Sequence, residues 1–215
     1  DRAETRPIAG TRPKGRTAVE TAQLREELIL SEKERAEHLM LVDLERNDLG
    51  RVCRYDTVEV DDLMGLEEYS HVIHIVSNVR GRLRPKTGLR EIVAALFPGG
   101  TISGCPKLRC LEVIDELEPV RRHFYTGSLG YVSYTGDMDL NILIRTAVAA
   151  GGQVHVQAGA GIVADSDPGK EYEETLHKAQ ALLEAITAHP EQAAHPSTGS
   201  GRAAVSKGSA QAVSA

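Results

Sequence analysis

Helix-forming residues with regularly spaced apolar positions dominate the first quarter of the chain. Residues 17–46 are rich in Ala, Glu, Leu, Lys and Arg, and apolar side chains such as Leu28 and Val42 recur within them. Ser31 and Glu34 match the capping-box pattern, in which a hydroxyl and a carboxylate close the first turn of a helix. We therefore expect either one long helix or two in succession, the second beginning at Ser31.

The pattern predicts three further helices downstream. A short one lies near Leu89–Leu96, and the next begins close to Pro106, a residue type that suits a first helical turn. This second helix carries an apolar stripe that we expect to face inward, formed by Leu108, Leu111, Ile114 and Leu117. The last helix runs from about Pro168 to Ala188.

Runs rich in Val and Ile predict the strands. The first two are Asp56–Val60 and His71–Leu83. Three more runs, separated by the turn-like sequences TGDM and AGGQ, predict a β-meander formed by Tyr125–Tyr134, Asp139–Ala149 and Gln153–Gly159. Helices combined with mostly antiparallel strands indicate an α+β fold, with largely antiparallel sheets covered by helices.

Composition limits the class of protein. Of the 215 residues, 41% are apolar and 26% are charged, which suits a globular domain. No apolar run reaches the roughly 18 residues of a membrane span, and the formal net charge of −6 argues against nucleic acid as a partner. The three cysteines lack CxxC spacing and predict neither a disulfide framework nor a zinc site, so we expect a cytoplasmic protein without a membrane partner.

One folded domain is expected at residues 1–188 and a disordered tail at residues 189–215. The tail consists largely of Ala, Ser and Gly without periodicity, and such a segment cannot bury enough apolar area to offset the entropy of ordering. The sequence opens within a motif and not with a methionine, so we expect it to be the C-terminal part of a longer protein.

Two pairs of glutamates lie three residues apart on expected helices. Glu34 and Glu37 form one pair and Glu171 and Glu174 the other, so each pair projects two carboxylates from one helix face. Four converging carboxylates would suit Mg²⁺. The alternative is that acids in a first helical turn complement the helix dipole, and the spacing alone favours this alternative.

Two glycine-rich loops could receive an anion. Gln157–Ser166 lies between a strand and a helix, where its backbone N–H groups could cradle a carboxylate, although a tight turn is the more common reason for such glycines. Phe97–Lys107 offers hydroxyls and a lysine beside a helix start, but Cys105 and Pro106 interrupt the order of a phosphate loop. A nucleotide site is therefore disfavoured.

Two polar side chains stand in apolar strands. His74 shares a strand face with Val72 and Val76, where a histidine of the core or of the sheet surface is the plainer interpretation. Arg145 follows a run of apolar residues and calls for a carboxylate partner, supplied by the protein or by a substrate.

Six sequence blocks follow one another between about residues 7 and 187. They read PIAGTRPKG, EKERAEHLMLVDLERNDLGRV, YSHVIHIVSNVRGRL, FPGGTISGCPKLR, GSLGY with DLNILIRT, and QAGAGIVADSDP with EYEET. In this order the blocks closely resemble the C-terminal half of the chorismate-utilising enzymes, anthranilate synthase component I and aminodeoxychorismate synthase component I. The resemblance implies the C-terminal half of their chorismate-binding fold.

The resemblance also implies roles for individual residues. Its Mg²⁺ ligands match Glu34, Glu37, Glu171 and Glu174. His74, rather than His71, matches the histidine that approaches the leaving hydroxyl, with Glu34 as the second catalytic residue, and Glu173 is expected to face solvent. Contacts to chorismate match Thr101, Tyr125, Arg145, Gly159, Ala160, Gly161 and Lys178.

The implied reaction is a Mg²⁺-dependent amination of chorismate for tryptophan biosynthesis. Ammonia from a glutamine amidotransferase subunit adds to the ring, the hydroxyl leaves, and pyruvate is eliminated to give anthranilate. Ala9 stands where many aminodeoxychorismate synthases carry a nucleophilic lysine, and VQAGAGIVADSDP also resembles the anthranilate branch. TGSLGYVSYTGDMDLNILIRT and Cys105 resemble the aminodeoxychorismate branch, which serves folate biosynthesis. That branch, and an inactive fragment of such an enzyme, stay open as alternatives.

Overall fold

The computed structural model describes residues 2–69, 72–164 and 166–188. The chain divides into two compact units, Asp1–Cys110 and Leu111–Ala215, and each is taken by itself below. Helices and antiparallel strands in both units confirm the α+β class. The expected disordered tail, residues 189–215, lies outside the described residues, and a single domain over residues 1–188 stays a prediction.

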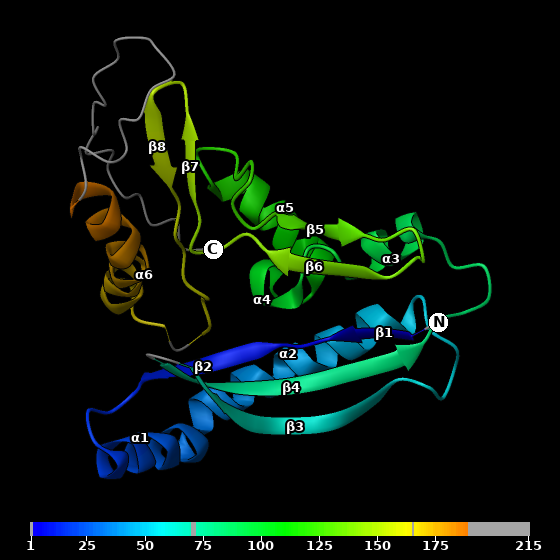
Figure 1. Cartoon of the computed structure of the whole chain (residues 1–215), viewed down its shortest axis with the longest axis horizontal. Coiled ribbons are helices and arrows are strands. Elements are labelled where there is room, and N and C mark those ends of the chain that lie inside the picture. The colour runs from blue at the N-terminus through cyan, green and yellow to red at the C-terminus, as the bar shows by residue number, and fades with distance from the viewer. Residues whose placement is uncertain (1, 70–71, 165, 189–215) are drawn as a thin grey trace. The chain divides into compact units, whose positions relative to one another are not determined.

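The first unit is organised around one long antiparallel strand. This strand, β4 (Val72–Arg82), pairs along one edge with β3 (Glu59–Glu68). Along its other edge it pairs with β1 (Arg2–Thr5) and then β2 (Ile8–Pro13), so these two short strands share one side of β4 (Figure 1). β4 is therefore the central strand, with β3 along one edge and the two short strands β1 and β2 along the other.

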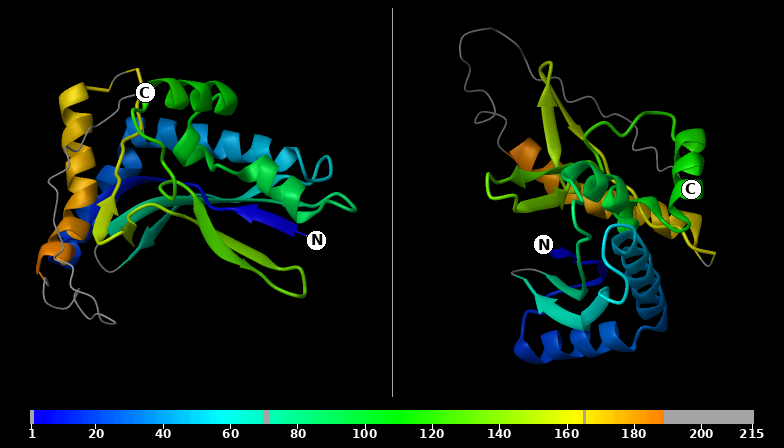
Figure 2. Two further views of the ribbon diagram at one scale, coloured as in Figure 1. Left: turned by 90° about the horizontal axis from the view of Figure 1, so that it is seen from above. Right: turned by 90° about the vertical axis from the view of Figure 1, so that its right-hand side faces the viewer.

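Helix α2 (Glu32–Gly50) covers one face of this sheet, as Figure 2 shows. Side chains alternate between the faces of a strand, and the residues of β4 that are fully buried beneath the helix include Ile73, Ile75, Ser77 and Val79. Val79 belongs to a core cluster with Val42 and Leu49 of α2. Helix α1 (Ala18–Leu30) adds Leu28, which packs on Ile73 and Ile75.

Residues 17–46 form two helices, as the capping-box pattern allowed. Ser31 ends α1 and also caps α2, because its hydroxyl accepts a hydrogen bond from the backbone N–H of Glu34 at 3.4 Å. The second strand prediction was also close, since β4 covers Val72–Arg82, while His71 lies outside the described residues.

The strand predicted at Asp56–Val60 begins later than expected. Asp56 has a φ of 61°, and the Thr57 hydroxyl donates to the carbonyl of Arg54 at 2.8 Å, so this segment forms a turn before β3 begins at Glu59. Helix α3 covers Leu89–Leu96 as predicted, and is followed by the short α4 (Gly100–Ser103) and by α5 (Lys107–Leu117). The apolar stripe of α5 is half-buried at Leu111 and Ile114 but exposed at Leu108 and Leu117.

The second unit contains two separate hairpins and a long helix. Strand β5 (Ser128–Val132) pairs with β6 (Met138–Ile142), and β7 (Ala147–Ala150) pairs with β8 (Gln153–Val156). Helix α6 runs over Pro168–Ala188, as predicted. None of the described helices combines the length and apolar character that a membrane crossing requires.

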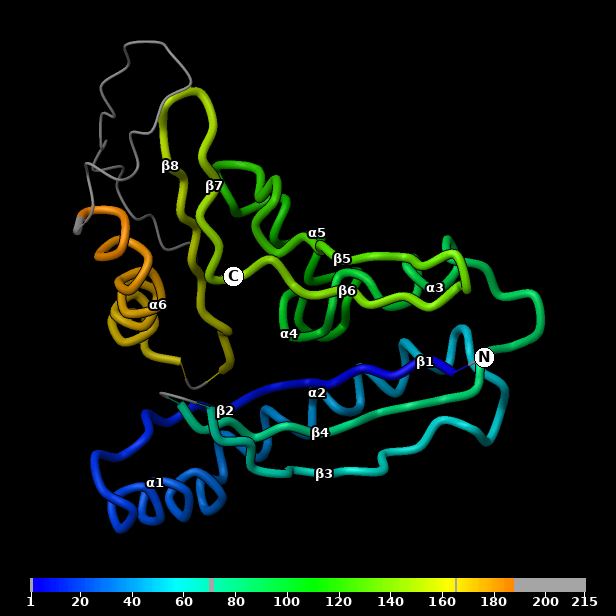
Figure 3. The backbone as a smooth tube through the Cα atoms, viewed as in Figure 1, coloured from blue at the N-terminus to red at the C-terminus, as the bar shows by residue number. Residues whose placement is uncertain are grey.

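The expected meander was therefore wrong, because the run Asp139–Ala149 forms two strands and not one. A tight turn, in which the N–H of Ile144 donates to the carbonyl of Ile142 at 3.0 Å, ends β6. Arg145 then adopts a φ of 52°, which turns the backbone before β7 begins (Figure 3). Arg145 consequently lies in a link between hairpins and is exposed, not in a strand as its sequence neighbours suggested.

Replacing Ser31 by Ala is expected to lower the free energy of unfolding by about 1 kcal/mol, because the first turn of α2 loses its side-chain cap. Urea-induced unfolding of the intact protein measures the change. Ser31→Asp is the control, since a carboxylate can accept the same hydrogen bond and should keep the stability. An equal loss in both variants would contradict the capping role.

Candidate functional site

A β-bulge at Gly10 places two polar side chains side by side. Ala9 pairs with Ile75 and Thr11 pairs with His74, so β2 uses one residue more than β4, and Gly10 takes a φ of 78° to accommodate it. Because side chains alternate along a strand, this extra residue moves Thr11 to the face that carries His74. The Thr11 hydroxyl oxygen lies 2.9 Å from Nδ1 of His74.

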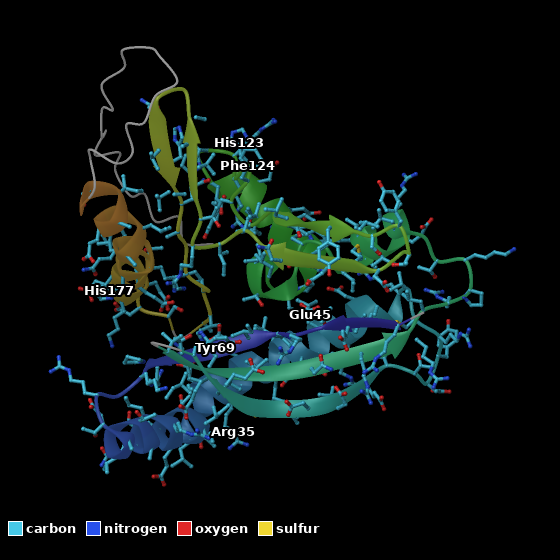
Figure 4. The ribbon with its side chains drawn as sticks, in the orientation of Figure 1. Arg35, Glu45, Tyr69, His123, Phe124 and His177 are labelled. Carbon is cyan, nitrogen blue, oxygen red and sulfur yellow. The ribbon has the colours of Figure 1, made fainter. Side chains whose placement is uncertain are left out.

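His74 is half-buried beside an ionised carboxylate. Glu67 stands opposite His74 in β3, and its carboxylate accepts hydrogen bonds from the Tyr69 hydroxyl at 2.7 Å and from Arg6. The Tyr69 bond, with Arg6, lowers the pKa of Glu67. The Tyr69 ring meets the imidazole edge-on at 5.6 Å between centroids (Tyr69 is labelled in Figure 4). With Nδ1 engaged by Thr11, Nε2 is the ring nitrogen left for chemistry.

Glu34 and Glu37 of α2 are half-buried, and Glu34 lies against the bulge in β2. Glu34 Oε1 accepts from the Arg12 guanidinium at 3.2 Å. A side chain at position 10 would place its Cβ 3.1 Å from Glu34 Oε2, so the glycine also leaves room for the carboxylate. Three successive residues of β2 therefore connect Glu34 with His74, while Glu37 lies on the same helix one turn further on.

A buried hydrogen bond fixes the orientation of α2. His38 Nε2 lies 2.6 Å from the Ser77 hydroxyl, which itself accepts from the backbone N–H of Met64 at 2.9 Å. The Ser77 proton is thus free to go to the imidazole, and burial lowers the pKa of His38, so the ring stays neutral. Since His38 adjoins Glu37, this bond sets the helix face on which both glutamates lie.

Thr101 lies in the short helix α4, where its side chain is exposed while Gly100 and Ser103 are buried. Lys107, the cation that a phosphate loop would need, is only 7% exposed and pairs with Asp48 of α2. The lysine is therefore engaged within the fold, which agrees with the rejection of a nucleotide site.

In the second unit, five of the predicted residues form one neighbourhood. Lys178 donates to the carbonyl of Gly159 at 3.2 Å and forms an ion pair with Glu174. The Tyr125 hydroxyl lies so close to Gly159 that a Cβ there would be 2.9 Å away. Burial raises the pKa of Tyr125, partly offset by the charges of Arg122 and Arg145, so Arg145 also acts on this tyrosine.

The glutamates near the start of α6 differ from one another in exposure. Glu171 is 8% exposed, and its Oε1 accepts from the Ser166 hydroxyl at 2.7 Å. The Glu174 side chain is 51% exposed and Glu173 is exposed as well. Among the residues described in each unit, no three His, Cys, Asp or Glu side chains gather at one point, so each unit by itself offers one pair of the predicted ligands.

Sequence reasoning missed the residues that hold these side chains. Thr11, Arg12 and Ser166 contact His74, Glu34 and Glu171 respectively. Only the glycine after Ala9 signalled a special backbone position. Of the remaining predicted contacts, Ala160 is half-buried and Gly161 is exposed in the loop before α6.

The chain matches a family described as chorismate binding enzyme over residues 1–184. A Synechocystis protein named anthranilate synthase component I-like protein is 64% identical over 86% of this chain and 38% of its own length. Aminodeoxychorismate synthase component 1 of Bacillus subtilis is 56% identical over 88% of this chain and 40% of its own length. The chain thus spans about two-fifths of these relatives.

A solved structure gives the same result for the fold. The crystal structure of anthranilate synthase component I from Streptococcus pneumoniae superposes with a TM-score of 0.72 at 42% identity. It covers 84% of this chain and 40% of its own, and so confirms the fold expected from the order of the sequence blocks.

The stability advantage of Glu45→Gln over the wild type is expected to grow with pH. Burial, the largest cause, raises the pKa of Glu45 above its ordinary 4.5. As the pH rises from 4.5 through the raised pKa, the unfolded state has lost a proton that the native state keeps, so wild-type stability falls.

The Glu45 carboxylate accepts a hydrogen bond from the N–H of Gly100 at 3.2 Å. Glutamine can accept the same bond but cannot ionise, so the variant does not lose stability in this way as the pH rises. Urea unfolding of both proteins at about pH 5 and about pH 8 measures it. A constant difference between the two proteins, or one that shrinks with pH, would contradict the assignment.

Proposed function

Because the chain belongs to the family of chorismate binding enzymes, we propose that the intact protein aminates chorismate with ammonia and eliminates pyruvate to give anthranilate. One observation carries the proposal. The bulge in β2 places Thr11 against His74 and places Gly10 against Glu34, so the proposed proton donor and one proposed metal ligand are held by the same short segment. The high identity to relatives named for both anthranilate and aminodeoxychorismate synthesis supports the reaction class.

Mg²⁺ is the cofactor that we propose, held by Glu34 and Glu37 together with Glu171 and Glu174. The donor set supports this choice, because carboxylate oxygens without neighbouring thiols suit a hard cation. Arg12 and Ser166 each occupy one oxygen of Glu34 and Glu171, which orients those carboxylates and leaves the second oxygen of each for a ligand. When bound, the cation would neutralise the ring carboxylate of chorismate and draw electron density from the ring.

His74 is proposed to assist departure of the ring hydroxyl. When the Thr11 hydroxyl donates to Nδ1, the ring proton sits on Nε2, which can donate to the leaving oxygen. The ionised carboxylate of Glu67, held by Tyr69 and Arg6, lies opposite this histidine on the neighbouring strand. The contact with Thr11 therefore fixes the ring proton of His74 at Nε2.

The residues of the second unit are proposed to bind the anionic side chain of the substrate. Arg145 is exposed and free of strand geometry, and a guanidinium suits a carboxylate. Gly159 and its neighbours Ala160 and Gly161 can offer backbone N–H groups. Lys178 and Tyr125 contact Gly159 and hold this loop in place. Thr101, an exposed threonine of α4, is proposed separately as a contact to chorismate.

Ammonia would come from a glutamine amidotransferase subunit, as the word component in the names of the relatives suggests.

Ala9 favours the anthranilate branch, because position 9 is nearly buried and carries no nucleophile. The second candidate is aminodeoxychorismate synthesis, which the Bacillus subtilis relative favours. We place the reaction in the cytoplasm and in tryptophan biosynthesis as part of the same proposal.

The intact protein, given chorismate, Mg²⁺ and ammonium, is expected to form fluorescent anthranilate and an equal amount of pyruvate. Fluorescence and a coupled pyruvate assay measure the two products. Aminodeoxychorismate that accumulates without pyruvate would overturn the choice of branch. No turnover by the folded intact protein would reject the enzyme and support a non-catalytic fragment.

Glu174→Gln is expected to lower kcat/KM by about 100-fold or more, because loss of an outer partner of a metal alone typically costs about 10–100-fold. Glu173→Gln, next to it on the same exposed turn, should leave activity nearly intact. Steady-state kinetics across a Mg²⁺ titration compares the two, and the Mg²⁺ requirement should rise only in the first. A larger loss of activity in Glu173→Gln than in Glu174→Gln would contradict the assignment of Glu174 as a ligand.

A further inference from the structure

We propose that Asp48 and Lys107 form a buried clamp that positions the turn carrying Thr101 for the substrate. The proposal rests on the function proposed above and adds two positioning residues to it. The turn is defined as Gly99–Ser103, which contains α4. Asp48 lies in the last turns of α2, and Lys107 is the first residue of α5, four residues beyond Ser103.

The ammonium of Lys107 makes three contacts, one for each of its N–H groups. It pairs with Asp48 Oδ2 at 2.5 Å, and it donates to the carbonyl of Pro98 at 2.7 Å and to that of Leu96 at 3.5 Å. Both carbonyls belong to the segment that enters the turn. One buried side chain therefore ties the entry of the turn, its exit and helix α2 together.

Glu45 supplies a second anchor from the same helix. Its Oε1 accepts from the N–H of Gly100 at 3.2 Å, and Figure 4 shows Glu45 on α2. A Cβ on Gly100 would lie 2.5 Å from Leu44 Cδ2, so the backbone of the turn is pressed directly against the helix. Glu45 and Asp48 are three residues apart, which puts both carboxylates on one helix face.

The pattern of exposure agrees with a positioning role. Gly100 and Ser103 are buried and Thr101 between them is exposed, so the anchored turn presents the threonine outward. A buried ion pair is weak support for stability, because well-packed apolar side chains of the same size often stabilise a fold equally well. What the pair gives that apolar side chains cannot is a fixed position for the Pro98 carbonyl, and hence for the turn.

The test uses the double variant Asp48→Asn/Lys107→Met of the intact protein. Both replacements are close in shape, and together they leave no buried charge unpaired, so the variant should fold even where either single replacement fails. Melting temperature and circular dichroism check the fold. Arg80→Met/Glu59→Gln is the matched control, because it makes the same two kinds of change in an ion pair of β3 and β4 that is more exposed.

In the double variant, KM for chorismate is expected to rise by about 10-fold or more, the range typical of lost outer partners. The value of kcat and the Mg²⁺ requirement should change much less, because the metal ligands lie elsewhere. Hydrogen exchange of the Thr101–Gly104 amides should speed up about tenfold while that of Val42 and Leu49 stays slow. A merely structural role would not single out this turn.

The outcomes separate the two proposals. If the wild type is active and the folded double variant keeps both its KM and the slow exchange of the turn, only the clamp is overturned. If the wild type neither binds nor converts chorismate, the proposed function fails, and the substrate role of the clamp with it. If the control variant Arg80→Met/Glu59→Gln raised KM as much as the clamp variant, the clamp would also be overturned. The loss of any ion pair would then be enough to raise KM.

Discussion

The packing of α2 on β4 is the contact on which the first unit depends. Apolar side chains of both elements form the core, and the hydrogen bond from Ser77 to His38 fixes how the helix is turned about its axis. An apolar interface alone would tolerate small rotations, whereas a buried donor and acceptor lose free energy unless they meet. The single rigid helix thereby sets Glu34 and Glu37 at one end and Glu45 and Asp48 at the other.

Much of the fold could be predicted from the pattern of apolar and polar residues. Capping residues near the helix ends set the boundary at Ser31 and the helix Leu89–Leu96, and the alternation of side chains sets the extent of β4. The meander failed because a single positive φ at Arg145 divides a run that is apolar throughout, and no residue type there announces it. The predicted site residues were found by motif order. Their partners Thr11 and Ser166 were not, because a bulge in β2 brings Thr11 to His74 and the burial of Glu171 brings that carboxylate to Ser166.

Glycine fits two positions of the first unit for different physical reasons. Gly10 carries a φ of 78° and also lies against Glu34, so any side chain would both strain the bulge and displace the carboxylate. Gly100 has ordinary backbone angles for a helix start but faces Leu44 at a distance that no Cβ could occupy. The first glycine is required by conformation and by space, the second by space alone.

Three of the proposed metal ligands differ in how firmly the protein holds them. Glu171 is buried and bonded to Ser166, and Glu34 is partly buried and paired with Arg12, so both are oriented before any ligand arrives. Glu174 is half exposed and pairs with Lys178 four residues on, and exposed pairs of this kind contribute little free energy. Under the proposed function, Glu174 is therefore the one of these three carboxylates that can leave its partner at least cost, while Lys178 keeps its hydrogen bond to the carbonyl of Gly159.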